Sequence, residues 1–511
     1  MGFHSILFET SAQEPDPKPT DAPEFFPDLN LDQIIDALTA GKEEYDLKPF
    51  FYTYVRDPDL VEYRQDIMRE MEDPTVFGVV KSFEQGMRTM RSQLALVDKL
   101  YYPQQKERWF LDAVQTYCDA VTALVHGLSG ADLRSRGMRA FLGYARSYVA
   151  SEGFVSLLSD TKAIESDLSS IQYCLLVNGN SVRVTKYESE IDYGAEVEEA
   201  FQKFKQAEVK SFLIAFSEGP DMNHVEAGVL ERVARLNPDV FLRLQEFRVR
   251  RTDYADGKIV AFDREVQFYV AYLEHAAVLK RSGLRFCYPQ IAVRSKEVYD
   301  YEGFDAALAY KLFKEGGTVV RNDFHLQGKE RVLVITGPNQ GGKTTFARTF
   351  GQLHYLAGLG CPVPGREARL FLYDRLFTHF EKEERIENLR GKLQDDLVRI
   401  HDILQRCTPE SIVIMNEVFA STTLTDVLFL SKQILYEVLR LDLLGVCVTF
   451  VDELASLNEK TVSMVSTVVP DNRAVRTFRI IRKPADGLAY AVFIAEKYGL
   501  TYSRVLERVR S

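Results

Sequence analysis

A glycine-rich loop between a strand and a helix restricts the fold of this chain more than any other feature. The strand is the apolar run from Val332 to Ile335, and a helical pattern follows the loop and ends at Gly358. The loop fits the pattern G-x-x-x-x-G-K-[ST] and consists of Gly337, Pro338, Asn339, Gln340, Gly341, Gly342, Lys343 and Thr344, with Thr345 next in the chain. This order of strand, loop and helix predicts a phosphate-binding loop in an α/β domain.

The residue types in this loop indicate ATP and Mg²⁺ as the bound cofactors. Glycines let backbone N–H groups turn inward around phosphates, and we expect Lys343 to contact the β- and γ-phosphates. The Thr344 hydroxyl is expected to ligate Mg²⁺, and the following helix directs its N-terminus at the anion. In the alternative interpretation, the loop is a glycine-rich turn in a degenerate domain that binds no nucleotide.

Composition places the chain among ordinary globular proteins and limits its partners. The chain has 511 residues, enough for several domains, with 46% apolar and 27% charged residues. A net charge of −11 argues against coating nucleic acid by bulk charge but leaves a local basic surface open. Six scattered cysteines without a C-x-x-C pair predict a reduced, cytoplasmic protein without a zinc or disulfide framework. We expect no membrane association, because the longest apolar run is too short to cross a bilayer.

The sequence pattern changes several times along the chain. Residues 12–28 hold five prolines, and we expect a flexible leader over residues 1–30. Residues 31–158 show mostly helical periodicity. A β-hairpin is expected near residues 171–187, because two strand-like runs meet at Asn178-Gly179. From residue 300 to the end, short strands alternate with helices, as in a sheet flanked by helices.

Two residue pairs are candidates for the end of the metal-side strand in the expected ATPase domain. The apolar residues 411–415 are followed by Asn416-Glu417, whereas such strands usually carry Asp-Glu. A second apolar run, residues 443–451, is followed by Asp452-Glu453. A glutamate after such a strand acts as general base if it lies within hydrogen-bond reach of the attacking water. The apolar pattern alone does not decide which of the two pairs ends the metal-side strand.

The loop sequence "GPNQGGKTT" closely resembles the phosphate loop of MutS-family ATPases, G-P-N-x-G-G-K-[ST]-[ST]. The resemblance extends over about the last 200 residues, where Asn322 lies at the position of a family asparagine near the nucleotide. Residues 374–380, Asp426 and residues 485–500 resemble further family segments. The resemblance implies a multidomain protein: a mostly α-helical core (31–158), a lever and clamp region (159–299), and an α/β P-loop ATPase domain of ABC/MutS type (300–511).

The family's chain order resolves the competition between the two pairs. In that family a later strand ends in a switch histidine, and residues 449–454 fit this later position, with Phe450 in place of the histidine. The resemblance therefore makes Asn416-Glu417 the Walker B pair, with Glu417 as the general base, and makes Asp452-Glu453 surface or interface carboxylates. The implied metal ligands are Thr344, Asn416 and Glu417. Gly391-Lys392 replaces the Ser-Thr of the family's trans signature, and Lys392 is either a cation for a second subunit or a solvated lysine.

These departures predict a weakened ATPase. Replacing the usual aspartate by Asn416 removes a negative charge, which contributes on the order of 4 kcal/mol at about 4 Å and an effective dielectric near 20. Phosphates and bound water would recover part of this energy. We therefore expect that ATP is bound, that Mg²⁺ is held less tightly and that hydrolysis is slow.

Two functions are compatible with the sequence. The first is an ATP-gated clamp on double-stranded or branched DNA, or on RNA, related to mismatch repair and DNA repair and working as a head-to-tail homodimer. The second is a nucleotide-binding dimeric scaffold that engages a protein partner with little hydrolysis. The helical core begins by about residue 45, so we expect no mismatch-reading domain, and Phe216-Ser217-Glu218 matches its wedge motif only by chance. We expect neither C-terminal dimerisation helices nor a small nuclease domain after Ser511.

Two clusters of arginines are candidates for phosphate contacts in the helical region. Arg248, Arg250 and Arg251 form one cluster, and Arg134, Arg136 and Arg139 form the other. Such runs are more often solvated faces than nucleic-acid contacts, so both interpretations stay open.

Overall fold

The chain folds into two compact units in the computed structural model, which describes residues 2–17, 19–189, 196, 222–381, 391–419, 422–469 and 472–485. The helical unit consists chiefly of Pro74–Leu133 and Ala140–Asp263. The larger unit consists of Phe3–Asp73, Arg134–Arg139 and Arg264–Ser511. The structure is thus mixed, with a helical region and an α/β region, while the predicted domain boundaries at residues 30, 158 and 299 stay predictions.

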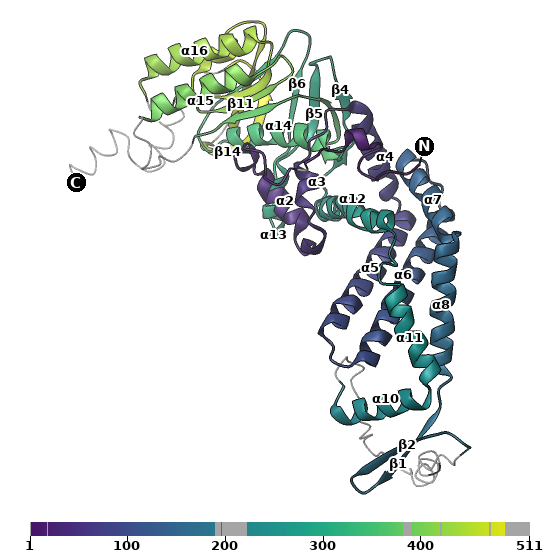
Figure 1. The fold of residues 1–511 in the computed structure, drawn as a ribbon. Helices are drawn as coiled ribbons and strands as arrows, with labels where there is room; N and C mark the ends of the chain where they lie inside the picture. The colour runs from purple at the N-terminus through teal and green to yellow at the C-terminus, as the bar shows by residue number, and fades with distance from the viewer. Residues whose placement is uncertain are drawn as a thin grey trace, which may run out of the picture. The chain divides into compact units, whose positions relative to one another are not determined.

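Long helices pack along each other in the helical unit (Figure 1). Its main helices are α5 (Pro74–Lys99), α6 (Pro103–Ser129), α8 (Glu152–Ser169), α10 (His224–Leu236) and α11 (Pro238–Arg250). Their ends follow from local sequence, since Pro103 and Pro238 occupy first-turn positions and Asn223 forms a capping box with Glu226. Two further helices, α7 (Arg136–Val149) and α12 (Gly257–Arg281), contribute residues to both units.

A hairpin extends the helical unit. Strands β1 (Tyr173–Asn178) and β2 (Ser181–Lys186) are antiparallel, with Asn178 opposite Ser181. The two turn residues are therefore Gly179 and Asn180, and Gly179 has the positive φ of 59° that glycine tolerates. The turn therefore lies one residue after the Asn178-Gly179 dipeptide from which the hairpin was predicted.

A mostly parallel sheet forms the centre of the larger unit. Among the described residues its six strands lie in the order β10-β11-β12-β7-β13-β14. Their bounds are Leu376–His379, Ile412–Asn416, Leu444–Val448, Val332–Thr336, Thr461–Val469 and Asn472–Arg482. Only β14 pairs in the antiparallel sense within this described set, alongside β13. Parallel strands need helical connections on the faces of a sheet, which explains why strands and helices alternate after residue 300.

Helices cover both faces of this sheet (Figure 1). One face packs against α15 (Lys392–Arg406) and α16 (Leu424–Arg440), with Val413 and Met415 of β11 in the shared core. The intervening residue Ile414 points to the opposite face, where it contacts the helix α14 (Lys343–Gly358) at Gly351. This alternation along β11 places the start of α14, and hence the glycine-rich loop, at the carboxyl ends of the central strands.

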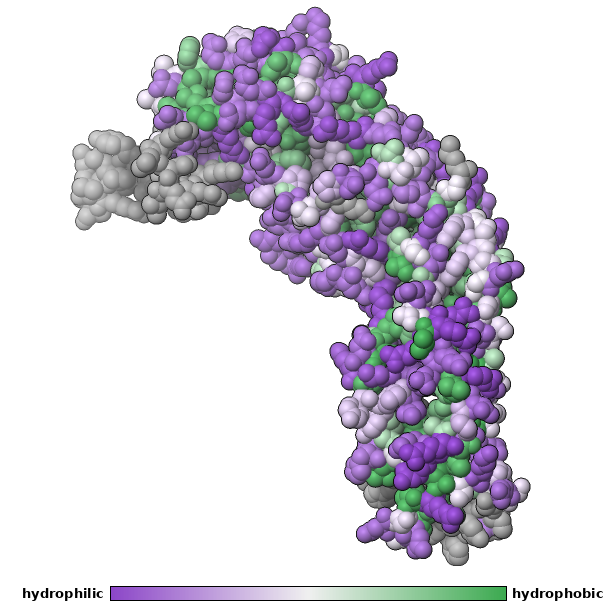
Figure 2. Space-filling view, in the orientation of Figure 1, coloured by the Kyte–Doolittle hydropathy of each residue, from purple (hydrophilic) through white to green (hydrophobic). Residues whose placement is uncertain are grey.

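Helix α16 has two different faces. Val427, Leu435 and Val438 are buried in the core against the sheet, and they fix the orientation of the helix. Phe429 and Tyr436 lie on the outer face with 62% and 48% of their surface exposed. Figure 2 shows apolar side chains at the surface in the area of α15 and α16.

A second sheet lies beside α14 in the larger unit. Its described strands lie in the order β4-β9-β5-β6, with bounds Gln290–Ala292, Glu367–Phe371, Val298–Gly303 and Asn322–Leu326. Alternate residues such as Val298, Phe324 and Leu370 are buried, while the residues between them are partly exposed. One face of this sheet therefore belongs to the core, and the other face is open to solvent.

The N-terminal segment differs from the flexible leader predicted for residues 1–30. Phe3, Ile6, Leu7 and Phe8 are at most 5% exposed, and the hydroxyl of Ser5 donates a 2.7 Å hydrogen bond to Glu265. Further on, α1 (Phe26–Leu29) packs beside α14, and α2 (Leu31–Thr39) follows it directly. Prolines prevent long helices here, but the apolar residues between them still supply enough surface to bury.

None of the described helices combines the length and the apolar character needed to cross a lipid bilayer.

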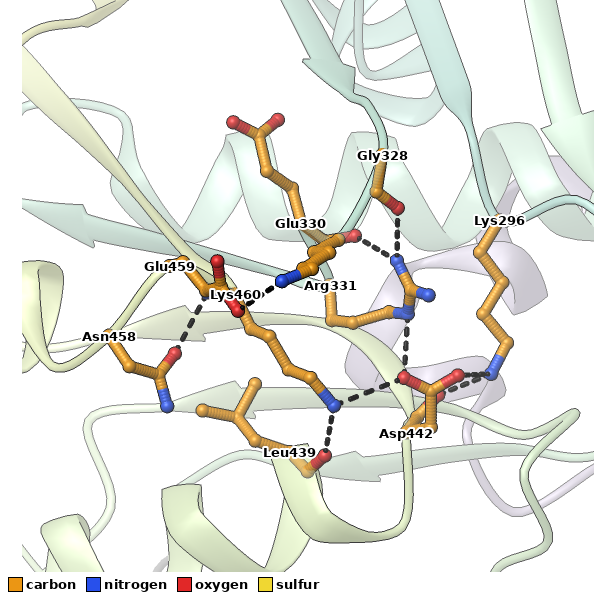
Figure 3. A network of polar contacts seen from close by, with 10 residues as sticks. Lys296, Gly328, Glu330, Arg331, Leu439, Asp442, Asn458, Glu459 and Lys460 are labelled. Carbon is orange, nitrogen blue, oxygen red and sulfur yellow. Dashed lines mark hydrogen bonds and ion pairs between the residues drawn. The ribbon is translucent and has the colours of Figure 1, made fainter.

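A network around Asp442 joins four segments of the larger unit (Figure 3). The carboxylate accepts hydrogen bonds from Lys296 at 2.8 Å, from Arg331 at 2.8 Å and from Lys460 at 3.4 Å. Burial raises the pKa of Asp442, but the bonds and charges of Lys296 and Arg331 outweigh it, so the net pKa is lowered. The network thereby fixes the starts of β7 and β13 to the turn between α16 and β12.

We predict that Asp442→Asn lowers the free energy of unfolding by on the order of 1 kcal/mol, because the carboxylate is 38% exposed and solvent screens its ion pairs. Asparagine tolerates the φ of 59° at this position, so the substitution removes charge without new backbone strain. The folded-state pKa is lowered, so this contribution is present above the ordinary pKa of about 4 and is lost as pH falls through the folded value.

Denaturant unfolding of the two proteins between pH 3 and pH 7 measures this effect. The difference should be largest near neutral pH and shrink under acidic conditions. A difference that stays constant over the whole pH range would contradict an electrostatic role for Asp442.

Candidate nucleotide site

The glycine-rich loop combines left-handed backbone positions with close packing against β13. Gly337, Gln340 and Gly342 have φ values of 115°, 59° and 89°. A Cβ atom on Gly341 would lie 2.3 Å from the hydroxyl oxygen of Ser466, which donates a 2.7 Å hydrogen bond to the carbonyl of Gly341. Residue 341 must therefore be a glycine, and Ser466 of β13 helps to fix the loop.

Lys343 is enclosed by the loop that precedes it. Its ammonium group donates to the carbonyls of Gly337 and Pro338 at 3.1 and 3.2 Å, and to Asn339 Oδ1 at 3.2 Å. Its Nζ atom also lies 3.6 Å from Glu417 Oε1. Burial lowers the pKa of Lys343, and the charge of Glu417 and a hydrogen bond to it act in the opposite direction. The cation is thus held at the position where the loop would receive an anionic group.

Strand β11 brings two further predicted residues to the loop. The Thr344 hydroxyl donates a 3.0 Å hydrogen bond to Asn416 Oδ1, while Glu417 lies next to Lys343. Glu417 has a φ of 51°, and its backbone N–H donates to the carbonyl of Val448 at 2.9 Å, which fixes the turn after the strand. The structure therefore brings together Lys343, Thr344, Asn416 and Glu417.

The competing pair lies in a different environment. Asp452 and Glu453 begin the short 3-10 helix Asp452–Ser456 after β12, and Glu453 is exposed. Strand β12 lies between β11 and β7 in the sheet. Among the described residues, the carboxylate beside Lys343 is that of Glu417. The Thr344 hydroxyl donates its hydrogen bond to Asn416. Asn416 and Glu417 are therefore the pair that contacts the glycine-rich loop, and their catalytic and metal-binding roles stay predictions.

An aromatic residue on β14 lies beside the N-terminus of α14. Phe478 has a φ of 58° and is 48% exposed, and its atoms lie 3.7 Å from where a Cβ on Gly342 would be. Asn322 holds this part of β14 with two hydrogen bonds: its Nδ2 donates to the carbonyl of Phe478 at 3.1 Å, and its Oδ1 accepts from the N–H of Ile480 at 2.8 Å. Asn322 thus fixes the part of β14 that lies beside the glycine-rich loop.

Sequence reasoning missed three residues of this site, namely Ser466, Arg476 and Phe478. Arg476 Nε donates a 3.1 Å hydrogen bond to the carbonyl of Asn339 in the loop. All three residues lie on β13 and β14, more than 120 residues after the loop, and no spacing pattern links them to it. The register of these strands against the loop depends on tertiary structure, which a local sequence pattern does not give.

The oxygen donors at the loop fit a magnesium ion better than a transition metal. Thr344 and Asn416 offer neutral oxygens, and Glu417 offers a carboxylate. Mg²⁺ prefers oxygen ligands and keeps several waters, and proteins usually supply only one or two of its ligands. No cluster of three or more His, Cys, Asp or Glu side chains suited to a metal ion is found in the described ranges. The residues thus fit Mg²⁺ held jointly with phosphates.

Other predicted residues have local partners. Lys392 forms an ion pair with Glu381, and Thr423 forms hydrogen bonds with Asp426 in the first turn of α16. Phe450, which follows β12, is 46% exposed. Thr345 contributes its carbonyl as acceptor for the Thr349 hydroxyl. Phe216-Ser217-Glu218 and all but the first residue of the segment 485–500 lie outside the described residues.

The arginine clusters are largely engaged within the chain. Arg251 pairs with Asp160 at 2.8 Å, and Arg136 pairs with Glu9 at 3.1 Å. Arg250 lies 4.0 Å from Glu246 on the same helix. These ion pairs reduce the charge that the clusters present to a phosphate backbone.

The fold and the site define a chain with a helical unit and an α/β unit that carries a glycine-rich loop opposite an Asn-Glu strand end. Residues 333–510 match the family model described as MutS domain V. The DNA mismatch repair protein MutS of Chlorobium phaeovibrioides is 28% identical over 204 residues, covering 39% of this chain and 23% of the relative. Residues 333–510 of this chain therefore resemble the MutS family.

Two further relatives show the extent of the similarity. The DNA mismatch repair protein MutS of Shouchella clausii is 30% identical over 191 residues, covering 36% of this chain and 22% of the relative. The protein of the same name from Clostridium kluyveri is 25% identical over 301 residues, covering 57% of this chain and 33% of the relative. The matched region thus spans between 22% and 33% of these relatives' own lengths.

We predict that Asn322→Ala disorders the part of β14 beside the loop, because the variant loses both side-chain hydrogen bonds to the β14 backbone. The amide of Ile480 should exchange faster with solvent, by roughly 10-fold for the loss of a hydrogen bond of about 1–1.5 kcal/mol. Asn322→Asp is the matched variant, because it keeps the acceptor for Ile480 and loses only the donor to Phe478.

Hydrogen exchange followed by mass spectrometry on peptides covering β14 measures both effects. Exchange in the aspartate variant should lie between the parent and the alanine variant. Equal protection in all three proteins would show that Asn322 does not hold β14.

Proposed function

We propose that this chain is a MutS-family protein that binds ATP with Mg²⁺ at a P-loop of ABC/MutS type and uses ATP binding to control a grip on nucleic acid. The observation that carries the proposal is the pairing of Lys343 with Glu417 and of Thr344 with Asn416 across the glycine-rich loop. Hydrolysis is slow in this proposal, because Asn416 is neutral.

Lys343 and Glu417 exchange partners when an anion enters the loop. The ammonium group donates at present to loop carbonyls and lies 3.6 Å from Glu417. A β- or γ-phosphate carries more negative charge than these carbonyls, so charge-assisted hydrogen bonds favour transfer of the lysine to the phosphates. Glu417 then loses its cationic neighbour and is available to orient and deprotonate a water molecule. Phosphate binding and activation of the base are thereby linked.

The metal-side residues act more weakly than a carboxylate would. Thr344 and Asn416 would hold Mg²⁺, directly or through water, and the ion would supply charge neutralisation for the phosphates. A carboxylate in place of Asn416 would add on the order of 4 kcal/mol of attraction at about 4 Å and an effective dielectric near 20. Without this charge, the ion depends more on the phosphates and on Glu417, so turnover is slow.

The nucleic-acid part of the proposal rests on the relatives, which carry the name DNA mismatch repair protein. We infer double-stranded or branched DNA as the first ligand to test, with RNA as a second. A homodimer would place Gly391-Lys392 of a second copy over the nucleotide, after Lys392 leaves Glu381. ATP-dependent dimerisation measured by light scattering, with a loss of this dependence in Lys343→Ala, tests this arrangement.

A second candidate function is a nucleotide-binding scaffold with almost no turnover. Phe450 favours it, because an apolar side chain at the position where the resemblance expects histidine cannot donate a hydrogen bond to a γ-phosphate. Gel-shift titration with homoduplex, mismatched and branched DNA at about 50 mM salt separates the two candidates. Salt-sensitive binding that changes with ATP supports the clamp, and the absence of binding to any nucleic acid supports the scaffold.

We predict that Glu417→Gln removes most residual ATP hydrolysis, by about 100-fold or more, because the general base is lost. Glu453→Gln is the matched control and should keep turnover within about twofold of the parent, since Glu453 is exposed in another segment. Lys343→Ala should instead abolish nucleotide binding without unfolding the chain. Steady-state phosphate release and calorimetric ATP binding on the four proteins measure these effects.

The roles of the two glutamates would be reversed if Glu453→Gln were inactive and Glu417→Gln active. Unchanged ATP binding by Lys343→Ala would exclude the glycine-rich loop as the nucleotide site.

We predict that Asn416→Asp lowers the Mg²⁺ concentration needed for half-maximal nucleotide binding by about 10-fold or more, because it restores a negative charge beside Thr344. Turnover should rise less than metal affinity, because Phe450 is unchanged. Nucleotide binding across a Mg²⁺ titration measures the effect, with Asn416→Ala as the variant that removes the oxygen. Indistinguishable titrations of the parent and the aspartate variant would place the metal elsewhere.

A further inference from the structure

The solvent face of the second sheet carries two neighbouring tyrosines. Tyr299 and Tyr301 alternate on β5 with Val298 and Asp300, whose side chains are buried on the opposite face. The ring centroids of the two tyrosines lie 5.3 Å apart with an interplanar angle of 33°. Both tyrosines are half-buried, so one side of the pair remains accessible to solvent.

Arginine and histidine side chains lie beside this pair. Tyr299 lies opposite Arg369 of β9 and opposite His325 of β6. The guanidinium of Arg366, which precedes β9, lies 5.8 Å from the centroid of the Tyr301 ring. Two arginines, Arg366 and Arg369, therefore lie beside the two aromatic rings.

Carboxylates lie on the same face as the two arginines. Glu367 accepts a 2.9 Å hydrogen bond from the Tyr299 hydroxyl, and this bond fixes the ring on the sheet. Glu302 pairs with Arg321 at 3.0 Å. Asp323 accepts a 2.7 Å hydrogen bond from the backbone N–H of Glu302. The face thus combines Arg366 and Arg369 with the carboxylates of Glu367 and Asp323.

We propose that this sheet face binds a single strand of nucleic acid by stacking bases on Tyr299 and Tyr301. Bases stack on aromatic side chains without regard to sequence, since every base has a π-face. Arg366 and Arg369 lie beside the rings and can contact the phosphates of such a strand, because guanidinium groups pair well with phosphate and with aromatic rings. The inference deepens the nucleic-acid part of the proposed function, but it does not depend on nucleotide binding at the glycine-rich loop.

A single strand fits this face better than a duplex does. Paired bases are stacked on each other inside a duplex and offer no free ring to Tyr299 or Tyr301. A flexible strand can turn its bases towards the sheet and its phosphates towards the arginines. The surface would therefore distinguish unpaired from paired segments by the accessibility of the bases.

Binding of a fluorescein-labelled oligothymidylate of about 20 nucleotides to the full chain, followed by anisotropy at about 50 mM salt, tests the proposal. The double variant Tyr299→Ala/Tyr301→Ala should bind at least about 10-fold more weakly, because each stacked base is lost. The double phenylalanine variant keeps the rings and should bind within about threefold of the parent. Tyr436→Ala on α16 is the matched control, since Tyr436 is an exposed tyrosine outside this sheet.

Arg366→Glu reverses the charge at an exposed position beside the Tyr301 ring and keeps both tyrosines. It should weaken binding and reduce the dependence of affinity on salt concentration. Thermal unfolding of each variant shows whether the fold is kept. If the double alanine variant is unfolded, the charge reversal and the phenylalanine variant decide the question.

Three results would overturn the proposal: no oligothymidylate binding by the parent, equal binding by the parent and the double alanine variant, or equal losses in that variant and in Tyr436→Ala. ATP binding is measured on the same proteins. If the double alanine variant loses oligothymidylate binding but binds ATP normally, the result supports this sheet face as the single-strand site. Normal single-strand binding in Lys343→Ala separates this surface from a failure of the nucleotide site.

Discussion

The close packing around α14 is the constraint on which the larger unit depends. Three glycines in and after this helix leave no space for a side chain: Gly351 contacts Leu29 and Ile414, Gly358 lies against the ring of Tyr54, and Gly360 lies against Arg64. Arg64 is itself buried and donates to the carbonyls of Leu7 and Leu359. The helix that carries Lys343 and Thr344 is thereby fixed to the N-terminal segment at one end and to the sheet along its length.

This packing explains why the glycine-rich loop can hold strained and buried groups. A helix enclosed on several sides cannot shift easily to relieve its N-terminus, since protein interiors transmit displacement rather than absorb it. The loop therefore keeps its left-handed residues Gln340 and Gly342, and Lys343 stays buried with its donors on the loop carbonyls. A site with fixed donors requires little reorganisation when an anion binds, and this preorganisation favours affinity.

Two parts of the candidate site could be predicted from the sequence: the contiguous glycine-rich loop, and the residue pair that follows from the order of motifs along the chain. The strand, loop and helix around Lys343 are contiguous, so their geometry follows from glycine positions and apolar pattern. Asn416 and Glu417 were found through chain order, and the structure brings them to the loop. Phe478, Arg476 and Ser466 were missed, because their positions depend on how β14 and β13 align with β7, which no local pattern encodes. The N-terminal segment was misjudged because proline content indicates the absence of long helices but gives no information about burial.

Glu417 has two roles in the proposed function, as the carboxylate beside Lys343 and as the candidate base. A buried ammonium group needs a negative neighbour, because desolvation disfavours its charged form. Lys343 has 4% of its side chain exposed, and Glu417 is the carboxylate that it contacts among the described residues. The same carboxylate is the candidate base, so it cannot orient water freely while it stabilises the lysine. Anionic phosphates would take over the first task and release Glu417 for the second. In the proposed function, nucleotide binding would therefore decide when Glu417 is released from Lys343. The slow hydrolysis that we propose agrees with this double use of one carboxylate.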